Sequence, residues 1–187
     1  MIILATTSRH RIGLFEKAGI PFKAVGSDVD EYAAHRPSDP TILPIFLATL
    51  KTKAVAQDYP DDIVLGFDTI NVFSGKILEK PKLRAEARNR LLSYRGKTIA
   101  VHTGICVIKG KEKKTHLSVG TFTLRNLSEW EIDRYLNADD GYLTRTCAFN
   151  TIHPLSADFV EKVEGSMMNY LHGFPVKEVL DLVKNLS

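Results

Sequence analysis

The 187-residue sequence predicts an α/β fold in which helices flank a mixed, twisted sheet. Short apolar runs typical of buried strands alternate along the chain with amphipathic helical patterns. Two pairs of strand-like runs are joined by turn signals, at Ser74-Gly75 and in the lysine-rich segment 109–114. Because a hairpin places its strands antiparallel, the sheet is not expected to be purely parallel.

The order of the elements follows the apolar pattern from the N-terminus. Residues 2–5 form an apolar run typical of a buried strand, and Thr6, Thr7 and Ser8 then supply hydroxyl groups that can cap a helix. Gly19 and Pro21 end that helix. The expected elements are strand 2–5, helix 12–18, strand 22–25, helix 41–57, strands 63–67, 70–73 and 77–78, helix 82–93, strands 99–108 and 116–124, helix 128–136, strand 159–163 and helix 175–186.

Local signals set several of these limits. Pro44 is compatible with the helix at 41–57 because it lies in the first turn, where its missing N–H costs nothing. Ser128, followed three residues later by Glu131, predicts a capping box. Proline and polar residues predict a loop at 36–40, and residues 137–158 are expected to be mostly irregular.

Composition excludes several classes of protein. With 44% hydrophobic and 25% charged residues, the chain is not expected to be disordered, collagen-like or a disulfide scaffold. The length predicts a single domain over residues 1–187, without an internal boundary. A net charge of +3 is a weak bias, and the basic segment 109–114 has no interleaved aromatic residues. We therefore expect no nucleic-acid partner, and the meaning of the charge depends on where individual cations converge.

The sequence also predicts a compartment. The N-terminus places an apolar run before its basic residues, the reverse of a signal peptide, and no segment is apolar for the length of a membrane helix. Cys106 and Cys147 have no metal-ligand spacing, and Cys106 lies in an apolar run typical of a buried reduced thiol. We expect a soluble cytoplasmic protein without a membrane partner.

The first candidate for chemistry is the turn at residues 6–11. A strand that ends in hydroxyl groups and opens a helix presents free backbone N–H groups to an anion. Arg9, His10 and Arg11 add positive charge where the helix dipole is already positive, a placement that favours a phosphate or carboxylate ligand. The alternative is a capped helix with surface arginines.

The second candidate is Asp68, in the sequence Gly66-Phe67-Asp68-Thr69. An acidic residue that ends an apolar strand is expected at the carboxyl edge of the sheet, where α/β proteins bind ligands. Such an aspartate can be a metal ligand or a general base, or it can only form a turn.

Several weaker candidates carry charge. Lys80 precedes Pro81, which biases the lysine toward extended backbone, although a solvated lysine is the simpler interpretation. Lys51 and Lys53 are two residues apart in a helix, so one is expected near solvent and the other elsewhere. The acidic residues Asp28, Asp30 and Glu31 fit either a solvated loop or part of a metal site.

These segments, in this order, resemble the Maf family of nucleoside triphosphate pyrophosphatases over most of the chain. The family opens with a strand and a Ser-x-Ser-Pro-Arg-Arg turn, and its later motifs include A-x-x-K-A-x-A, G-A-D-T, G-K-P and Val-x-Thr-Gly. The matching segments here are 6–11, 19–22, 27–31, 48–56, 66–69, 79–81 and 101–104.

The chain departs from the family pattern at two places. Its turn is Ser8-Arg9-His10-Arg11, so His10 replaces one arginine and Arg11 is the arginine that matches. The family's Gly-Ala-Tyr-x-Ile-Gln-Gly segment resembles residues 147–154 with an insertion, and the glutamine is missing, with His153 nearest. We expect these departures to affect the choice of nucleotide first and catalysis second.

The resemblance implies an elongated, two-lobed structure with the site in a central cleft, and commonly a homodimer. It implies hydrolysis of the bond between the α and β phosphates of a non-standard or surplus nucleoside triphosphate. Its catalytic residues would be Asp68, Lys80, Lys51 and Arg11, and a divalent cation, Mg²⁺ or alternatively Mn²⁺, would be held by Asp68 and Asp30. The expected substrate-binding residues are Thr6, Thr7, Ser8, His10 and Thr69. The alternative is a divergent, weakly catalytic nucleotide-binding or regulatory homologue.

Overall fold

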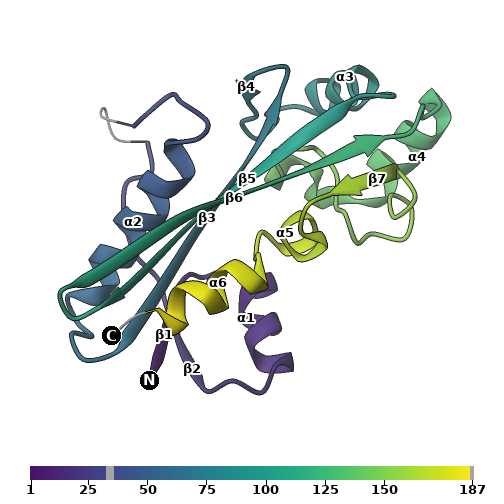
Figure 1. Ribbon diagram of the computed structural model, residues 1–187. Helices are drawn as coiled ribbons and strands as arrows, with labels where there is room; N and C mark the ends of the chain where they lie inside the picture. Colours follow the sequence, from purple (N-terminus) through teal and green to yellow (C-terminus); the bar gives the residue numbers. More distant parts are fainter. Residues whose placement is uncertain (33–35, 186–187) are drawn as a thin grey trace.

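The computed structural model describes residues 1–32 and 36–185, which form one mixed seven-stranded sheet with helices on both faces (Figure 1). The strand order is β2-β1-β3-β5-β6-β7, and β4 pairs with β3 outside that path. The strands are β1 (Ile2–Ala5), β2 (Phe22–Val25), β3 (Ile63–Phe73), β4 (Lys76–Ile77), β5 (Thr98–Lys109), β6 (Glu112–Leu124) and β7 (Val160–Glu164). The helices are α1 (Arg9–Lys17), α2 (Leu43–Ala56), α3 (Arg84–Ser93), α4 (Glu129–Ala138), α5 (Met167–His172) and α6 (Val176–Lys184), with the 3₁₀ helix η1 (Asp140–Thr144).

The predicted mixed sheet is confirmed. β1 runs parallel to β2 and β3, whereas β3, β5, β6 and β7 pair antiparallel. The long β5–β6 hairpin carries the lysine-rich segment at its tip, and only Gly110 and Lys111 form the turn. This sheet provides the frame on which the candidate site is built.

The prediction that an apolar strand ends at Asp68 is wrong. β3 continues through Asp68 and Thr69 to Phe73, because β5 pairs with it from Val64 to Val72 and supplies partners past the polar residues. Two other strands cover the opposite edge of β3 only in part. Within the described residues, β1 pairs with β3 as far as Gly66, and β4 begins to pair at Val72. The carbonyl of Asn71 still accepts a hydrogen bond from Leu78 N at 2.8 Å, so the stretch between the two strands, residues 67–70, is called the open edge of β3 below.

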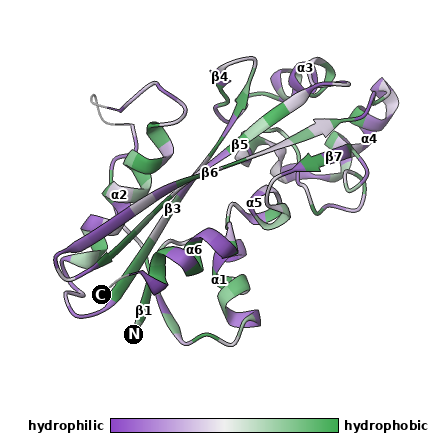
Figure 2. Cartoon of the chain, viewed as in Figure 1, coloured by the Kyte–Doolittle hydropathy of each residue, from purple (hydrophilic) through white to green (hydrophobic). Residues whose placement is uncertain are grey.

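The two faces of the sheet carry different helices. α2 packs on one face, and α1, α5 and α6 pack on the other (Figure 1). Glycines allow α2 to approach closely: a Cβ at Gly66 would lie 2.0 Å from Thr52 Oγ1, and a Cβ at Gly104 would lie 2.1 Å from the Pro44 carbonyl. This close packing brings the middle of α2 over Asp68. Figure 2 shows the apolar colour along β1, whereas β6 near the hairpin tip is hydrophilic.

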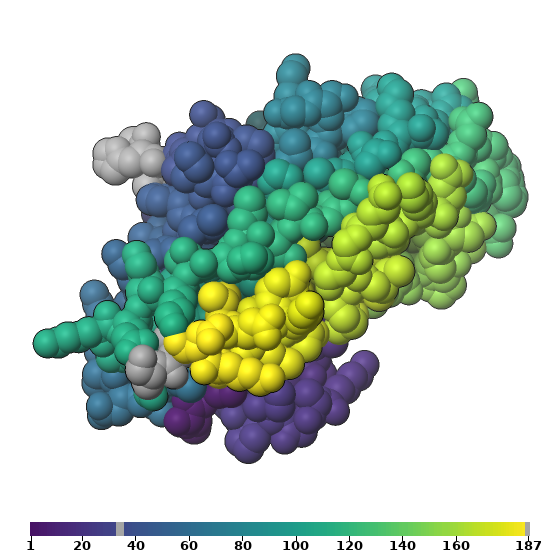
Figure 3. All heavy atoms as spheres, in the orientation of Figure 1, coloured from purple at the N-terminus to yellow at the C-terminus, as the bar shows by residue number. Residues whose placement is uncertain are grey.

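Two apolar clusters lie at opposite ends of the long sheet. One contains Leu4, Phe15 and Phe67 beneath α1 and α6, and the other contains Tyr135 and Phe159 beneath α3 and α4. The outline is elongated, with α6 and the N-terminal segment toward one end and β7 toward the other (Figure 3). This arrangement agrees with the two-lobed α/β architecture expected from the resemblance.

The predicted helix limits are confirmed in some places and not in others. The capping box of α4 is confirmed by both of its bonds, from Glu131 N to Ser128 Oγ and from Ser128 N to the Glu131 carboxylate. α5 was not predicted, because the helix has only six residues. The closing helix ends at Lys184, and its predicted end at Leu186 lies outside the described residues. Both cysteines are free and buried, and no described helix has the length and apolarity needed to cross a membrane.

Candidate active site

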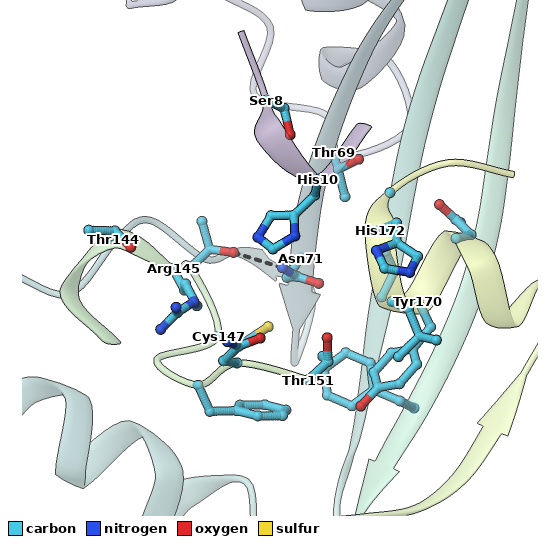
Figure 4. A pocket seen from close by; sticks show the side chains of 18 of the residues that line it. Ser8, His10, Thr69, Asn71, Thr144, Arg145, Cys147, Thr151, Tyr170 and His172 are labelled. Carbon is cyan, nitrogen blue, oxygen red and sulfur yellow. Dashed lines mark hydrogen bonds between the residues drawn. The ribbon is translucent and has the colours of Figure 1, made fainter. Parts of the chain in front are cut away.

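A cavity of about 360 Å³ opens between the two lobes, on the face of the sheet that carries α1 and α5 (Figure 4). Its wall takes side chains from the start of α1, from the strands, from the segment 144–151 and from the end of α5. Ser8, His10 and Arg11 line it from α1, Thr69 and Asn71 from β3, and Lys80 from the loop after β4. Segments far apart in the sequence therefore meet at one site.

Arg11 is the best-anchored cation of this cavity. Its Nη2 donates to Thr69 Oγ1 at 3.0 Å, its Nη1 to the Phe67 carbonyl at 3.3 Å, and its Nε to the Gly173 carbonyl at 3.3 Å. The guanidinium also lies 5.4 Å from the centre of the Phe67 ring. Burial lowers the pKa of Arg11 from its ordinary value, an effect that Asp68 and Glu31 oppose. Since an arginine stays protonated in proteins, Arg11 is a fixed positive charge at the open edge.

Gly173 makes this anchoring geometrically feasible. It ends α5 in the left-handed region, at φ 57°, where a side chain is strained. A Cβ at this position would lie 2.4 Å from Thr69 Oγ1 and 3.1 Å from Arg11 Nη2. Glycine therefore lets the end of α5 approach the contact between α1 and β3.

A charged cluster lies on the other face of β3. Lys51, from α2, donates from Nζ to Asp68 Oδ1 at 2.7 Å and forms an ion pair with Glu31 Oε1 at 3.0 Å. The side chains of Lys51 and Asp68 are only 14% and 10% exposed, whereas Lys53 is exposed, as its spacing predicted. Two carboxylates thus converge on one ammonium group beneath α2. We call these three residues the carboxylate–lysine cluster.

Burial sets the protonation behaviour of Asp68. Desolvation raises the pKa of its carboxyl group above the ordinary value, Lys51 lowers it, and the nearby charge of Glu31 raises it further. A buried carboxylate whose pKa is raised accepts a proton more readily than an exposed one. The arrangement therefore makes proton uptake by Asp68 easier than it is for an exposed aspartate.

The open edge of β3 joins the cavity to the carboxylate–lysine cluster. Arg11 binds the residues on either side of Asp68, and it interacts electrostatically with the Asp68 carboxylate. Lys80 lies in the loop after β4, beyond the other end of the open edge, and is exposed. The four residues Arg11, Lys51, Asp68 and Lys80 are thus grouped around one stretch of β3, although Lys51 and Asp68 face away from the cavity wall.

The predicted substrate-binding residues lie at different distances from the cavity. Ser8, His10 and Thr69 line it, and Ser8 is the N-cap of α1, with no hydrogen bond from its side chain to the helix. Thr6 lies behind them and accepts a hydrogen bond from Ser8 N at 3.1 Å. Thr7 is exposed and is not part of the cavity wall. His10 faces His172, with ring centres 6.4 Å apart (Figure 4).

The acidic segment differs in detail from the expectation. Asp30 is exposed, and its Oδ1 accepts a hydrogen bond from Tyr32 N at 2.9 Å, whereas Glu31 is the residue that reaches Lys51. Among the described residues, no group of three or more His, Cys, Asp or Glu side chains forms a ready-made metal site. Two converging carboxylates nevertheless suit Mg²⁺, which prefers oxygen ligands and takes others from water and phosphate.

The segment 144–151 forms a wall of the cavity, although none of its residues was among the predicted site residues. It is tied down at both ends, by Arg90 Nη1 donating to the Thr146 carbonyl at 2.6 Å and by Asn150 N donating to Tyr135 Oη at 2.8 Å. Ala148 adopts φ 62°, a strained value for a residue other than glycine. His153, the residue nearest the missing glutamine in sequence, packs on Tyr135 outside the cavity wall, whereas Asn150 and Thr151 line the cavity.

Comparisons with known proteins find relatives over the whole length of the chain. The model of a family described as Maf-like protein matches residues 1–186. A protein named dTTP/UTP pyrophosphatase from Deinococcus radiodurans is 34% identical over 98% of this chain and 91% of its own, and one of the same name from Dictyoglomus thermophilum is 33% identical over 100% and 96%. Among solved structures, the Staphylococcus aureus Ham1 protein aligns with 67% of this chain and 72% of its own, at 16% identity and a TM-score of 0.46.

Proposed function

Because the chain belongs to the Maf family, we propose that it hydrolyses nucleoside triphosphates to the monophosphate and pyrophosphate. Water attacks the phosphoanhydride that links the α and β phosphates, and the P–O bond of the bridge breaks. The oxygen and the two protons of the water are shared between the two products, and no atom changes its oxidation state. The relatives' names suggest dTTP and UTP as substrates. The observation that carries the proposal is the grouping of Arg11, Lys51, Asp68 and Lys80 around the open edge of β3.

Cations hold the triphosphate in this proposal. Arg11 and Lys80 flank the open edge, and a chain of three phosphates can lie across it with a cation toward each end. The backbone N–H groups at the start of α1, next to Ser8, add donors for the same anion. Charge that develops on the bridging oxygen as the bond breaks is stabilised by these fixed donors, which need no rearrangement during the reaction.

Asp68 acts as the base that orients and deprotonates the attacking water. Its raised pKa favours proton uptake, and Lys51, only 2.7 Å away, holds the carboxylate in place. Lys51 is paired with two carboxylates in the free protein. The phosphates of a bound substrate are also anionic, so the Lys51 ammonium group can move toward them. The base and the cation are thereby supplied from the face of β3 that carries α2.

A divalent cation fits the same cluster. Asp68 and Glu31 already direct carboxylate oxygens at one cationic group, the ammonium of Lys51. They would hold Mg²⁺, with Mn²⁺ as the alternative. Asp30 would join them if its carboxylate turns away from Tyr32 N. Bound there, the metal would neutralise phosphate charge as a Lewis acid. The sequence analysis named Glu31 among three acidic candidates but assigned the metal to Asp68 and Asp30, whereas the ion pair with Lys51 favours Glu31.

Three further expectations belong to the proposal. The whole chain acts as a single domain, because the cavity takes its walls from both lobes. The protein works in the cytoplasm, where its nucleotide substrates are, and neither nucleic acid nor a membrane is a partner. It assembles as a homodimer, which gel filtration with light scattering tests directly.

A turnover screen tests the function. The protein is incubated with each nucleoside triphosphate and Mg²⁺, with an added inorganic pyrophosphatase to convert pyrophosphate to phosphate for detection. We expect monophosphate and pyrophosphate in equal amounts from at least one nucleotide, and loss of turnover when EDTA removes the metal. If no nucleotide is turned over and the Asp68→Asn variant behaves like the unchanged protein, the enzymatic assignment is wrong.

A further inference from the structure

The floor of the cavity changes character along the sheet. Thr69 on β3 is paired with Thr103 on β5, with their hydroxyl oxygens 2.8 Å apart, and this pair lies next to Arg11. Two residues farther along β3, Asn71 is paired with Val101, and the adjacent wall carries the aromatic side chains of Phe122, Phe149 and Tyr170 among polar ones that include Thr151 and Asn169. A nucleotide has the same polarity, from anionic phosphates to an aromatic base. The end with the aromatic side chains is therefore the place for the base, and Asn71 is the polar side chain that β3 presents there.

The amide of Asn71 is hydrogen-bonded to the hydroxyl of Thr146. Its Nδ2 donates to Thr146 Oγ1 at 2.7 Å, and the carbonyl of Thr146 is itself fixed by Arg90 at 2.6 Å. In residues 1–32 and 36–185 no group donates a hydrogen bond to Asn71 Oδ1. Figure 4 shows this oxygen directed into the cavity, away from the bond to Thr146. The site thus contains an amide oxygen that faces the cavity beside a wall with three aromatic side chains.

We propose that Asn71 Oδ1 accepts the imide N3–H of a uracil or thymine base, which makes Asn71 a residue that selects these bases over cytosine. The inference rests on the proposed function. Uracil and thymine carry a hydrogen-bond donor at N3, whereas cytosine carries an acceptor there, so the same amide oxygen attracts the first two and repels the third. dTTP and UTP differ in their sugar and in one methyl group but share this imide.

The surroundings strengthen the discrimination. Val101, which pairs with Asn71, and Phe122 have no polar side-chain group, so neither can compensate an acceptor that faces the acceptor at cytosine N3. Sites that hydrogen-bond a substrate group reject analogues without it far more strongly than apolar pockets reject a change in size. The amide, rather than the volume of the cavity, is therefore the selecting feature.

The test compares UTP with CTP in the full-length protein and in Asn71→Val. Valine suits a strand and keeps the size of the side chain, and turnover of CTP reports that the variant is folded. We expect the unchanged protein to prefer UTP by kcat/KM, and the variant to lose about tenfold of that preference, almost all of it through slower use of UTP. A UTP-to-CTP ratio that is the same in both proteins would overturn the proposal.

A second variant and a second substrate separate the alternatives. Thr146→Val removes the hydrogen-bond partner of the amide, so it should reduce the UTP-to-CTP ratio less than Asn71→Val does, whereas Thr144→Val, another change in the cavity wall, should leave the ratio unchanged. If Asn71→Val slows UTP and CTP equally but leaves 3′-deoxyuridine triphosphate unaffected, the oxygen contacts the sugar and the base assignment is wrong. If the unchanged protein turns over no nucleotide at all, the proposed function fails first.

Discussion

The two faces of β3 differ in their chemical groups, although both are formed by alternating residues of one strand. Gly66 and Asp68 face α2, where charges are paired and the Asp68 side chain is 10% exposed. Phe67, Thr69 and Asn71 face α1, α5 and the segment 144–151, where neutral groups and Arg11 line an open cavity. The difference follows from the two-residue period of a strand, which sends neighbouring side chains to opposite faces.

This division has a functional consequence. A buried carboxylate beside a lysine suits proton transfer, whereas a cavity lined by hydroxyl, amide and aromatic groups suits recognition of a nucleoside. The two meet only at the open edge, where β1 has ended and β4 has not begun, and where Arg11 reaches the carbonyl of Phe67. Substitutions on the face toward α2 should therefore change kcat, and substitutions on the cavity face should change KM or the choice of nucleotide.

The largest expected effect tests the face toward α2. Asp68→Asn removes the base and keeps the size of the side chain, so kcat should fall by about 10³-fold while KM changes little. Asp61→Asn, an exposed position, is the matched control and should leave kcat unchanged. Steady-state kinetics with the preferred nucleotide measure both. An Asp68→Asn variant with a raised KM and an unchanged kcat would contradict the proposed division of the two faces.

The next effect tests the junction between the faces. Arg11→Lys keeps the charge but loses the fork that bonds Phe67, Thr69 and Gly173 together, so kcat/KM should fall by about 10-fold to 100-fold. Because the ammonium group can still attract phosphate, most of the loss should be in KM. Lys53→Arg on the exposed side of α2 is the control for a change of cation type. Equal kinetics for Arg11→Lys and the unchanged protein would mean that the fork has no role in binding substrate.

Much of the sheet and its helices was predictable from the sequence, because most of these elements have a local sequence signal. β1, β2 and the capping box of α4 follow from short-range patterns and have the predicted limits or bonds. β3 was divided wrongly because polar residues normally end a buried strand, and only the pairing with β5, more than 30 residues later, carries the strand past Asp68. Local patterns contain no information about that partner.

The candidate site was predictable to a similar extent. Arg11, Lys51, Asp68 and Lys80 belong to short motifs, so the sequence brought them into consideration before their proximity was known. Glu31 and Asp30 are adjacent acidic residues, and only the ion pair with Lys51 distinguishes them. No motif in the sequence singles out Asn71. Its place in the site became visible only through the hydrogen bond to Thr146, which lies in a distant loop.

The pH dependence of kcat distinguishes the partners of Asp68. If Asp68 is the base, as proposed, only its ionised form is active, so kcat should fall about tenfold per pH unit below the raised pKa of Asp68. Lys51 lowers that pKa and Glu31 raises it. Lys51→Met should therefore move the acidic limb of the profile to higher pH, and Glu31→Gln should move it to lower pH. Shifts in the same direction would contradict the electrostatic arrangement on the face toward α2.

The smallest expected effect adds charge to the cavity face. His10 stands where the family motif has an arginine, and it lines the cavity opposite His172. Burial, helped by His10 and Lys17, lowers the pKa of His172, so this ring is neutral at pH 7 and leaves the phosphate end short of positive charge. His10→Arg should lower KM about threefold without changing kcat, an effect that added salt weakens because the new charge is exposed. His116→Arg adds the same charge on the exposed side of β6 and should change neither constant. Equal changes in the two variants would mean that net charge, rather than its location in the cavity, governs attraction of the nucleotide.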